Sequence, residues 1–383
     1  MEKMNDCLFT IIISAYNREK SLETLLKSLS DADYNSKSVN LVISIDSNKY
    51  KNVIDIAMGF KWNYGIKKVV VHEEQKGLKN HFLWCGDQTY KVGPVLFLEE
   101  DMIVSKFFVN YVDEFLSYYS NDARVAGSSL YSIQYNEMIT TNFIPVDDGS
   151  DVFFYQQAYW GKIYHPEKWN EFRLWYNKGV FDLSLLPINV QNWGDKSFKK
   201  FYILYLVTNN KYIVFPRRSL ATNMGVAGLH ASNLIEYQTP LLLGQKKWNF
   251  INFDESHSIY DAYQEIVPKI VKYFNPLLLN YDFDVDINGT KHILQCDYVL
   301  TMKKTKKYML KFSYHLKPLI SNVFHNIDGN SIFLVKNESN KIFRKISKKT
   351  RIRQMYLSLR TNNIINKKKL IIMTLISLFS RER

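Results

Sequence analysis

The chain has few of the residues that interrupt regular structure. Its 383 residues include 15 glycines and 9 prolines, whereas 46% of the residues are hydrophobic. This composition argues against low-complexity linkers, and the length is sufficient to bury a sizeable core. We therefore predict one large folded domain with an appendage.

Cysteine is also scarce. Cys7, Cys85 and Cys296 lie far apart in the sequence. Because no CxxC or other paired spacing occurs, the sequence predicts neither a disulfide framework nor a zinc site. Such cysteine usage is typical of proteins in a reducing cytoplasm.

Long apolar runs and phosphate-binding glycine loops are missing. No stretch reaches the roughly 18 apolar residues of a membrane span, and Leu370–Phe379 comes nearest. The apolar run at Leu8–Ser14 is too short for a signal peptide, so we interpret it as a first strand. Neither GxGxxG nor GxxxxGK[ST] follows that run, which argues against a dinucleotide-binding dehydrogenase and a P-loop NTPase.

Positive charge is concentrated at one end of the chain. Residues 303–383 hold 20 Lys and Arg against 3 acids, a net +17, whereas residues 1–302 hold 30 against 34, a net −4. Lysines mixed with short apolar stretches are expected on an anionic membrane surface, and the alternative is a solvated basic helix. We predict a basic helical tail that places a cytoplasmic protein peripherally at the inner face of the cell membrane.

The first 130 residues alternate between two hydrophobic periods. Strand-like apolar runs occur at 8–16, 39–46, 66–73 and 94–101, and stretches with helical spacing separate them. Buried strands that alternate with helices indicate βαβ units and a mainly parallel sheet. In such a sheet, ligands bind beyond the carboxyl ends of the strands.

Polar side chains follow the predicted strands at that edge. Arg18 follows the first run, Asp46 the second, and Glu99, Glu100 and Asp101 end the fourth. Adjacent carboxylates repel one another, and a hard divalent cation would neutralise them and also hold a diphosphate. The alternative is an acidic turn that caps the following helix. We predict the cation–diphosphate site.

Several segments together resemble a known family. The first half contains "IIISAYNREKSLETLLKSL", "VISIDSN", "LKNHFLWC" and "LFLEEDMIVSKFF", and "AYWGKIY", "NWGDKSF" and "FPRRSLATNMGVAGLHAS" follow. In order and spacing these segments resemble GT-A fold glycosyltransferases, most closely the inverting N-acetylglucosaminyltransferase I type, over residues 8–235. The resemblance implies an α/β, Rossmann-like, mainly parallel sheet flanked by helices, and a bacterial surface-glycan enzyme.

The resemblance also implies roles for individual residues. Arg18 and Asp46 would contact the uridine with His81 nearby, Asp101 would ligate Mn²⁺ or Mg²⁺, and Glu100 would lie by the ribose or sugar. Asp195 would be the catalytic base, and a loop containing His230 would close over the donor. This chain has Trp193-Gly194-Asp195 where the family has two acids directly after the Trp.

Alternatives remain for several of these residues. His81, beside Phe82 and Trp84, fits a satisfied core histidine equally well. Asp195 could be an ordinary surface carboxylate. Trp160 and Trp193 could stack on an acceptor sugar or be buried aromatics.

We divide the chain into three parts. Residues 1–235 form the glycosyltransferase domain, with a nucleotide-sugar half at 1–130 and an acceptor half at 131–235. Residues 236–302 form an α/β extension, and 303–383 the basic tail.

Residues 284–295 nearly match a calcium loop, but Gln295 stands where a bidentate Glu is required. We therefore predict a β-hairpin with an Asn288-Gly289 turn.

The function predicted from the sequence is metal-dependent, inverting sugar transfer. The donor would be a UDP-sugar carrying GlcNAc or another hexose, and the acceptor a glycan or lipid-linked saccharide in surface polysaccharide synthesis. One alternative is a sugar nucleotidyltransferase of similar fold, although no glycine follows the first strand. The other is a non-catalytic basic adaptor for membrane or nucleic acid, and no nucleic-acid motif supports it.

Overall fold

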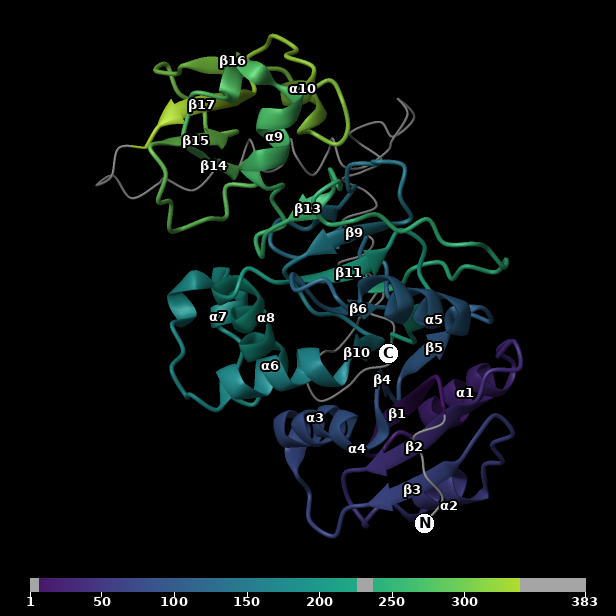
Figure 1. Ribbon diagram of the computed structural model, residues 1–383. Coiled ribbons are helices and arrows are strands. Elements are labelled where there is room, and N and C mark those ends of the chain that lie inside the picture. Colours follow the sequence, from purple (N-terminus) through teal and green to yellow (C-terminus); the bar gives the residue numbers. More distant parts are fainter. Residues whose placement is uncertain (1–6, 226–236, 338–383) are drawn as a thin grey trace, which may run out of the picture.

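The computed structural model of the protein describes residues 7–225 and 237–337 (Figure 1). Within these residues the largest unit is a nine-stranded sheet with the order β13-β9-β11-β6-β10-β4-β1-β2-β3. A smaller four-stranded sheet lies at the end of the molecule remote from β3 (Figure 1).

The parallel half of the large sheet is built from the four predicted apolar runs. The strands are β1 Phe9–Ala15, β2 Val39–Ile45, β3 Lys67–Val71 and β4 Val95–Glu99. β1 pairs in parallel with both β2 and β4, and β2 pairs in parallel with β3. β2 is buried along its whole length, as expected of a strand covered on both faces. The predicted α/β class with a mainly parallel sheet is confirmed.

Helices connect these strands, as parallel neighbours in a sheet require. They are α1 Glu19–Ser30, α2 Lys51–Gly59, α3 Gly77–Asp87 and the short α4 Thr89–Val92. In α1 the apolar residues at helical spacing, Leu22, Leu25, Leu26 and Leu29, are all buried. The hydrophobic spacing seen in the sequence therefore defines the face that packs on the sheet.

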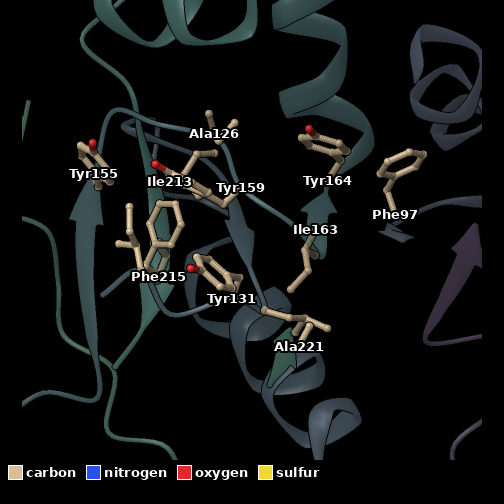
Figure 2. Packing of buried hydrophobic residues seen from close by; sticks show 14 of the residues in the cluster. Phe97, Ala126, Tyr131, Tyr155, Tyr159, Ile163, Tyr164, Ile213, Phe215 and Ala221 are labelled. Atoms are coloured by element: carbon tan, nitrogen blue, oxygen red, sulfur yellow. The ribbon is translucent and has the colours of Figure 1, made fainter. Parts of the chain in front are cut away.

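The other half of the sheet begins with a strand of opposite direction. β10 (Lys162–Tyr164) lies antiparallel between β4 and β6 (Val125–Ser129). Beyond β6 follow β11 Tyr212–Pro216, β9 Val152–Tyr155 and β13 Ile259–Tyr260. Large aromatic side chains fill this half of the core, including Tyr131, Tyr155, Tyr159, Tyr164 and Phe215 (Figure 2). The abundance of Tyr and Phe in the sequence is thus mainly a packing feature.

Four further helices complete this part of the chain. They are α5 Phe108–Tyr119, α6 Pro166–Tyr176, α7 Ile188–Gln191 and α8 Phe198–Thr208. α8 contacts both α6 and α3, so it bridges the two halves of the sheet. Two small antiparallel pairs are added: β5 Met102–Val104 with β12 Ala221–Asn223, and β7 Tyr135–Asn136 with β8 Thr141–Asn142.

The predicted domain boundaries differ from the observed units. β13 belongs to the large sheet, so the segment after 235 begins within the main domain. The smaller sheet has the order β14-β15-β17-β16. Its strands are β14 Phe283–Asp286, β15 Tyr298–Thr301, β16 Leu310–Phe312 and β17 Ile332–Lys336, with α9 Pro268–Phe274 and α10 Ser321–Phe324 beside them. The predicted boundary at 302/303 therefore falls inside one folded sheet.

The predicted hairpin at 284–295 is wrong. β14 pairs in parallel with β15, and residues 291–297 form no strand. The Asp286 carboxylate accepts the backbone N–H groups of Thr290 and Lys291 at 2.8 and 3.0 Å, which closes a side-chain-bonded turn in place of a two-residue hairpin. Lys291 Nζ forms an ion pair with Asp261 Oδ2 at 2.6 Å.

In the described part of the chain, no helix combines the length and apolar character that a membrane crossing requires. Residues 338–383, which make up most of the predicted basic tail, lie outside the described residues.

Candidate functional site

The carboxyl ends of three strands meet in register. The Glu100 backbone N–H donates to the Ser14 carbonyl at 3.1 Å, and the Asp46 N–H donates to the Ala15 carbonyl at 2.9 Å. Glu100 and Asp101 form the turn that joins β4 to β5. The sheet therefore brings the predicted polar residues after β1, β2 and β4 to one edge, where α/β proteins bind ligands.

The acidic turn is held from two sides. The Tyr16 backbone N–H donates to Glu100 Oε2 at 2.7 Å, which links the turn to the end of β1. The Met224 N–H donates to the Asp101 carbonyl at 2.9 Å, and β12 pairs with β5 directly after the turn. The segment around 221–225, far away in sequence, is thus part of the same site.

Arg18 provides a cation for both acids. Its guanidinium is paired with the Asp101 carboxylate, and its Nε lies 3.9 Å from Glu100 Oε1. Arg18 is the residue before α1, so the β1–α1 connection aims it at the end of β4. The structure brings Arg18, Glu100 and Asp101 together, in direct contact with one another and with no described contact to Asp46.

Burial makes these carboxylates unusually weak acids. Burial raises the pKa of Glu100 to about 7, although the Tyr16 N–H and Arg18 favour its charged form. The pKa of Asp101 is raised by burial and by the negative charge of Glu99, against the pull of Arg18. Arg18 only partly offsets the cost of burying the negative charge of these two carboxylates. A further cation bound beside them would therefore be stabilised.

A divalent cation fits this arrangement if a ligand completes its shell. Among residues 7–225 and 237–337, no three Asp, Glu, His or Cys side chains gather into a metal site. Mg²⁺ and Mn²⁺ are often held by one or two carboxylates together with substrate phosphates and water. Asp101 would supply such a carboxylate, so the remaining ligands would have to come from a diphosphate and water.

Asp46 has a structural role at the same edge. Its carboxylate accepts the backbone N–H groups of Lys76 and Gly77 at 2.8 and 3.0 Å, at the start of α3. Gly77 has a positive φ of 72°, a conformation in which glycine is favoured. Asp46 thereby sets where α3 begins beside the site, and its predicted uridine contact stays a prediction.

His81 lies in the core between β1 and β2. Its Nδ1 is 3.0 Å from Ser14 Oγ and its Nε2 is 2.7 Å from Ser44 Oγ. Burial, followed by the nearby His72 and Lys76, lowers the pKa of His81 to about 3, so the ring is neutral. Both ring nitrogens are occupied, which favours the core-histidine alternative over a uridine contact.

This environment predicts a pH-dependent stability. Because the pKa of His81 falls from 6.5 to about 3 on folding, the stability is full above pH 6.5 and is lost as the pH falls towards 3. Between pH 7 and pH 5 the wild type should lose about 2 kcal/mol of unfolding free energy from this residue. In His81→Gln, denaturant unfolding at both pH values should show a smaller loss by that amount. Equal losses in the two proteins would contradict the buried neutral imidazole.

The two tryptophans predicted on the acceptor side lie in different surroundings, Trp160 among aromatic side chains and Trp193 beside α8. The Trp160 ring packs on Tyr131 and Tyr237, at 5.1 and 5.8 Å between centroids. Trp193 precedes α8, and its ring lies 4.9 Å from Lys199 Nζ. Both tryptophans are half-buried, so each retains accessible surface, and the acceptor-stacking role stays a prediction.

Asp195 points into solvent at the start of α8. Its side chain is 95% exposed and one oxygen lies 3.3 Å from the buried Lys200 Nζ. Lys200 also donates to the Trp193 carbonyl at 2.6 Å, which fixes the loop that carries Asp195. Phe198 stacks on Phe82, 5.1 Å between centroids, and so links this loop to α3. No contact within the described ranges joins Asp195 to the acidic turn.

Two features of the site were not predicted from sequence. The Tyr159 hydroxyl donates to Glu137 Oε1 at 2.7 Å, which adds a carboxylate beside Trp160. Glu99 is paired with Lys162 at 3.3 Å. A lysine inside the apolar and aromatic segment "AYWGKIY" was the available signal, since a lysine in such a segment is buried only with a partner. The predicted loop residue His230 lies outside the described residues.

Comparison with known proteins gives structural matches only. No protein-family model matches the chain, and no curated protein sequence does. The chain is similar to S. aureus TarS 1-349 in complex with UDP-GlcNAc, at 17% identity and a TM-score of 0.40, over 58% of this chain and 60% of that one. GalNAc-T7 with UDP, GalNAc and Mn²⁺ matches at 12% identity and a TM-score of 0.35, over 55% of this chain and 43% of that one.

Mouse xyloside xylosyltransferase 1 matches at 11% identity and a TM-score of 0.35, over 54% of this chain and 83% of that one. The chain spans about three fifths of the length of the TarS 1-349 chain. At this level of similarity, function has to be argued from the side chains of the site.

Proposed function

We propose that this protein is a divalent-cation-dependent glycosyltransferase that moves a sugar from a UDP-sugar to a glycan or lipid-linked saccharide, with inversion. The observation that carries the proposal is the cluster of Arg18, Glu100 and Asp101 at the carboxyl edge of the parallel sheet. A sugar-nucleotide carries a diphosphate. This cluster combines the planar guanidinium of Arg18, which can bind phosphate, with one carboxylate for a hard metal ion and a second that can accept hydrogen bonds from sugar hydroxyls.

On the donor side, each residue has a separate task. Asp101 would hold the cation and Glu100 the ribose or sugar hydroxyls. When bound, a divalent cation stabilises the negative charge that develops on the leaving diphosphate. The planar Arg18 guanidinium would exchange its carboxylate partner for the nucleotide, since such a group binds both kinds of oxygen.

On the acceptor side, the reaction needs one proton acceptor. Asp195 would take the proton of the acceptor hydroxyl while that oxygen forms its bond to the anomeric carbon and the bond to the diphosphate breaks. The exposed position of Asp195, with Lys200 behind it, leaves its other oxygen open to such a hydroxyl. Trp160 and Trp193 would supply aromatic faces for the acceptor sugar.

The proposal is tested by a panel of nucleotide-sugars. The full chain is mixed with each compound and Mn²⁺, and binding and hydrolysis are measured. We expect UDP-GlcNAc or another UDP-hexose to bind and to be hydrolysed slowly. Synthesis of a nucleotide-sugar from a sugar phosphate and a nucleoside triphosphate, with release of pyrophosphate, would instead identify a nucleotidyltransferase. If the protein bound no nucleotide or nucleotide-sugar, the result would support the alternative of a non-catalytic basic adaptor.

We also propose that the basic tail holds the protein at an anionic membrane surface, and removing residues 338–383 tests this. That segment holds 13 Lys and Arg against 2 acids, and ending the chain at 337 keeps the small sheet whole. Because each basic residue near an anionic surface contributes about 1 kcal/mol, the shortened chain should sediment with anionic vesicles at least about tenfold less well. Neutral vesicles are the control. Equal sedimentation of both chains would contradict the role of the tail.

A further inference from the structure

Glu99, the first of the three adjacent acids Glu99, Glu100 and Asp101, has a partner from the other half of the sheet. β10 pairs antiparallel with β4, and Lys162 lies opposite Phe97. Phe97 and Glu99 share one face of β4 because side chains alternate along a strand. Lys162 therefore reaches its diagonal neighbour, and its Nζ lies 3.3 Å from Glu99 Oε1.

The backbone before Lys162 sets its position. Gly161 has a positive φ of 64°, and a Cβ at this position would lie 2.8 Å from Leu130 Cβ. Any larger residue would therefore meet both backbone strain and a clash. On one side of Gly161, Trp160 packs on Tyr131 and Tyr237. On the other side, Lys162 begins β10 and reaches Glu99.

Lys162 is buried in an aromatic environment. Its side chain is 7% exposed, and its Nζ lies 4.5 Å from the centroid of Phe82 and 5.2 Å from that of Phe97. The ring faces attract the ammonium, but its removal from water is costly. A methionine would fill similar space without that cost. The ion pair is therefore poorly explained by stability alone.

The charges around the acidic turn divide into two groups. Lys162 neutralises Glu99, whereas Arg18 faces Glu100 and Asp101. Without Lys162, Glu99 would lose its ion-pair partner, next to Glu100 in sequence and at the end of the strand that leads into the turn. Its carboxylate could then move to Arg18 or to a cation bound at Asp101.

We propose that Lys162 is a positioning residue, which holds Glu99 away from the donor pocket and so sets the place of Glu100 and Asp101 for a cation-bound nucleoside diphosphate. The inference rests on the proposed function. It assigns Glu99 to the charge balance of the site, and only Glu100 and Asp101 to the donor.

The test uses two variants and a matched control. Lys162→Met removes the cation, and the double variant Lys162→Met/Glu99→Gln removes its partner as well. Lys168→Met removes another buried lysine. Lys168 lies on α6, donates to the Asp122 backbone carbonyl at 2.9 Å and does not contact the turn. For each protein, UDP affinity in Mn²⁺ is measured by calorimetry, along with kcat, KM and thermal unfolding.

Lys162→Met should weaken UDP binding in Mn²⁺ about 10- to 100-fold, the usual loss when a supporting residue beyond the metal's own ligands is removed. Its unfolding temperature should change little, because the Glu99 side chain left unpaired is 30% exposed. The double variant should regain most of the affinity, and Lys168→Met should bind UDP as the wild type does. Wild-type affinity in Lys162→Met, or no recovery in the double variant, would overturn the proposal. Absence of UDP binding by the wild type would instead overturn the proposed function.

Discussion

Replacing Asp101 with asparagine should lower kcat/KM for the UDP-sugar by about 10²- to 10³-fold, the usual effect of removing one group that stabilises charge in a transition state. The substitution keeps the shape and the Met224 backbone contact of the turn, and it removes the carboxylate charge that faces Arg18. Initial rates over a range of Mn²⁺ concentrations measure the effect, and the rate loss should be largest at low Mn²⁺ and shrink as the Mn²⁺ concentration rises.

The matched control for this variant is Asp113→Asn. Asp113 is a half-exposed acid on α5 that pairs with Lys37 at 3.1 Å, and it contacts none of the site residues. Its loss should leave kcat/KM within about twofold, because surface ion pairs contribute little. Normal turnover and normal metal dependence in Asp101→Asn would place the cation site elsewhere.

Replacing Asp195 with asparagine should lower kcat by about 10²- to 10⁴-fold, the contribution expected of a general base. Donor affinity should not change, because Asp195 makes no described contact with the acidic turn. Calorimetry with UDP and Mn²⁺, together with rates at saturating acceptor, separates the two effects. The hydrolysis of donor without acceptor should fall less than transfer.

Asp182→Asn is the control for the Asp195 substitution. Asp182 is an exposed acid in the same half of the molecule, and it caps a short 3-10 helix at Leu183–Leu185, a role that asparagine also fills. Its turnover should match the wild type. If Asp195→Asn transfers sugar normally, the base is another group, and Glu137 beside Tyr159 is the next carboxylate to replace.

The parallel half of the sheet could be predicted because its signals are local. Continuous apolar runs became β1 to β4, and the leucines at helical spacing in α1 are buried. The convergence of Arg18 with the acidic turn follows from the rule that parallel strands end at one edge. The ion pair between Arg18 and Asp101 was not predicted. From the sequence, Arg18 could equally well contact a uridine, and nothing local shows that its guanidinium is directed at Asp101.

The remaining site features depend on pairing over long distances in sequence. Lys162 meets Glu99 because β10 inserts antiparallel beside β4, and a short strand of three residues carries no register information of its own. The hairpin prediction failed for a related reason. Asp286 satisfies nearby backbone N–H groups, and β15 offers β14 a parallel partner, so tertiary pairing overrides the local turn preference of Asn288-Gly289.

The predicted start of the basic tail at residue 303 is wrong because a count of charges does not reveal strands. Residues 303–337 are rich in lysine, yet Phe312 and Ile332 are buried in a sheet while the lysines around them face outward. A charge count describes the surface of a segment and does not report whether alternate residues are buried.

The most direct measurement is a calorimetric titration of the full chain with UDP, once in Mn²⁺ and once in EDTA. We expect saturable binding of one UDP in Mn²⁺ and an affinity at least about tenfold lower in EDTA, since Asp101 would hold the cation and the cation would neutralise the charge of the diphosphate. Binding of UDP that is equally tight in EDTA would contradict the cation site, and no binding under either condition would contradict a nucleotide-sugar enzyme altogether.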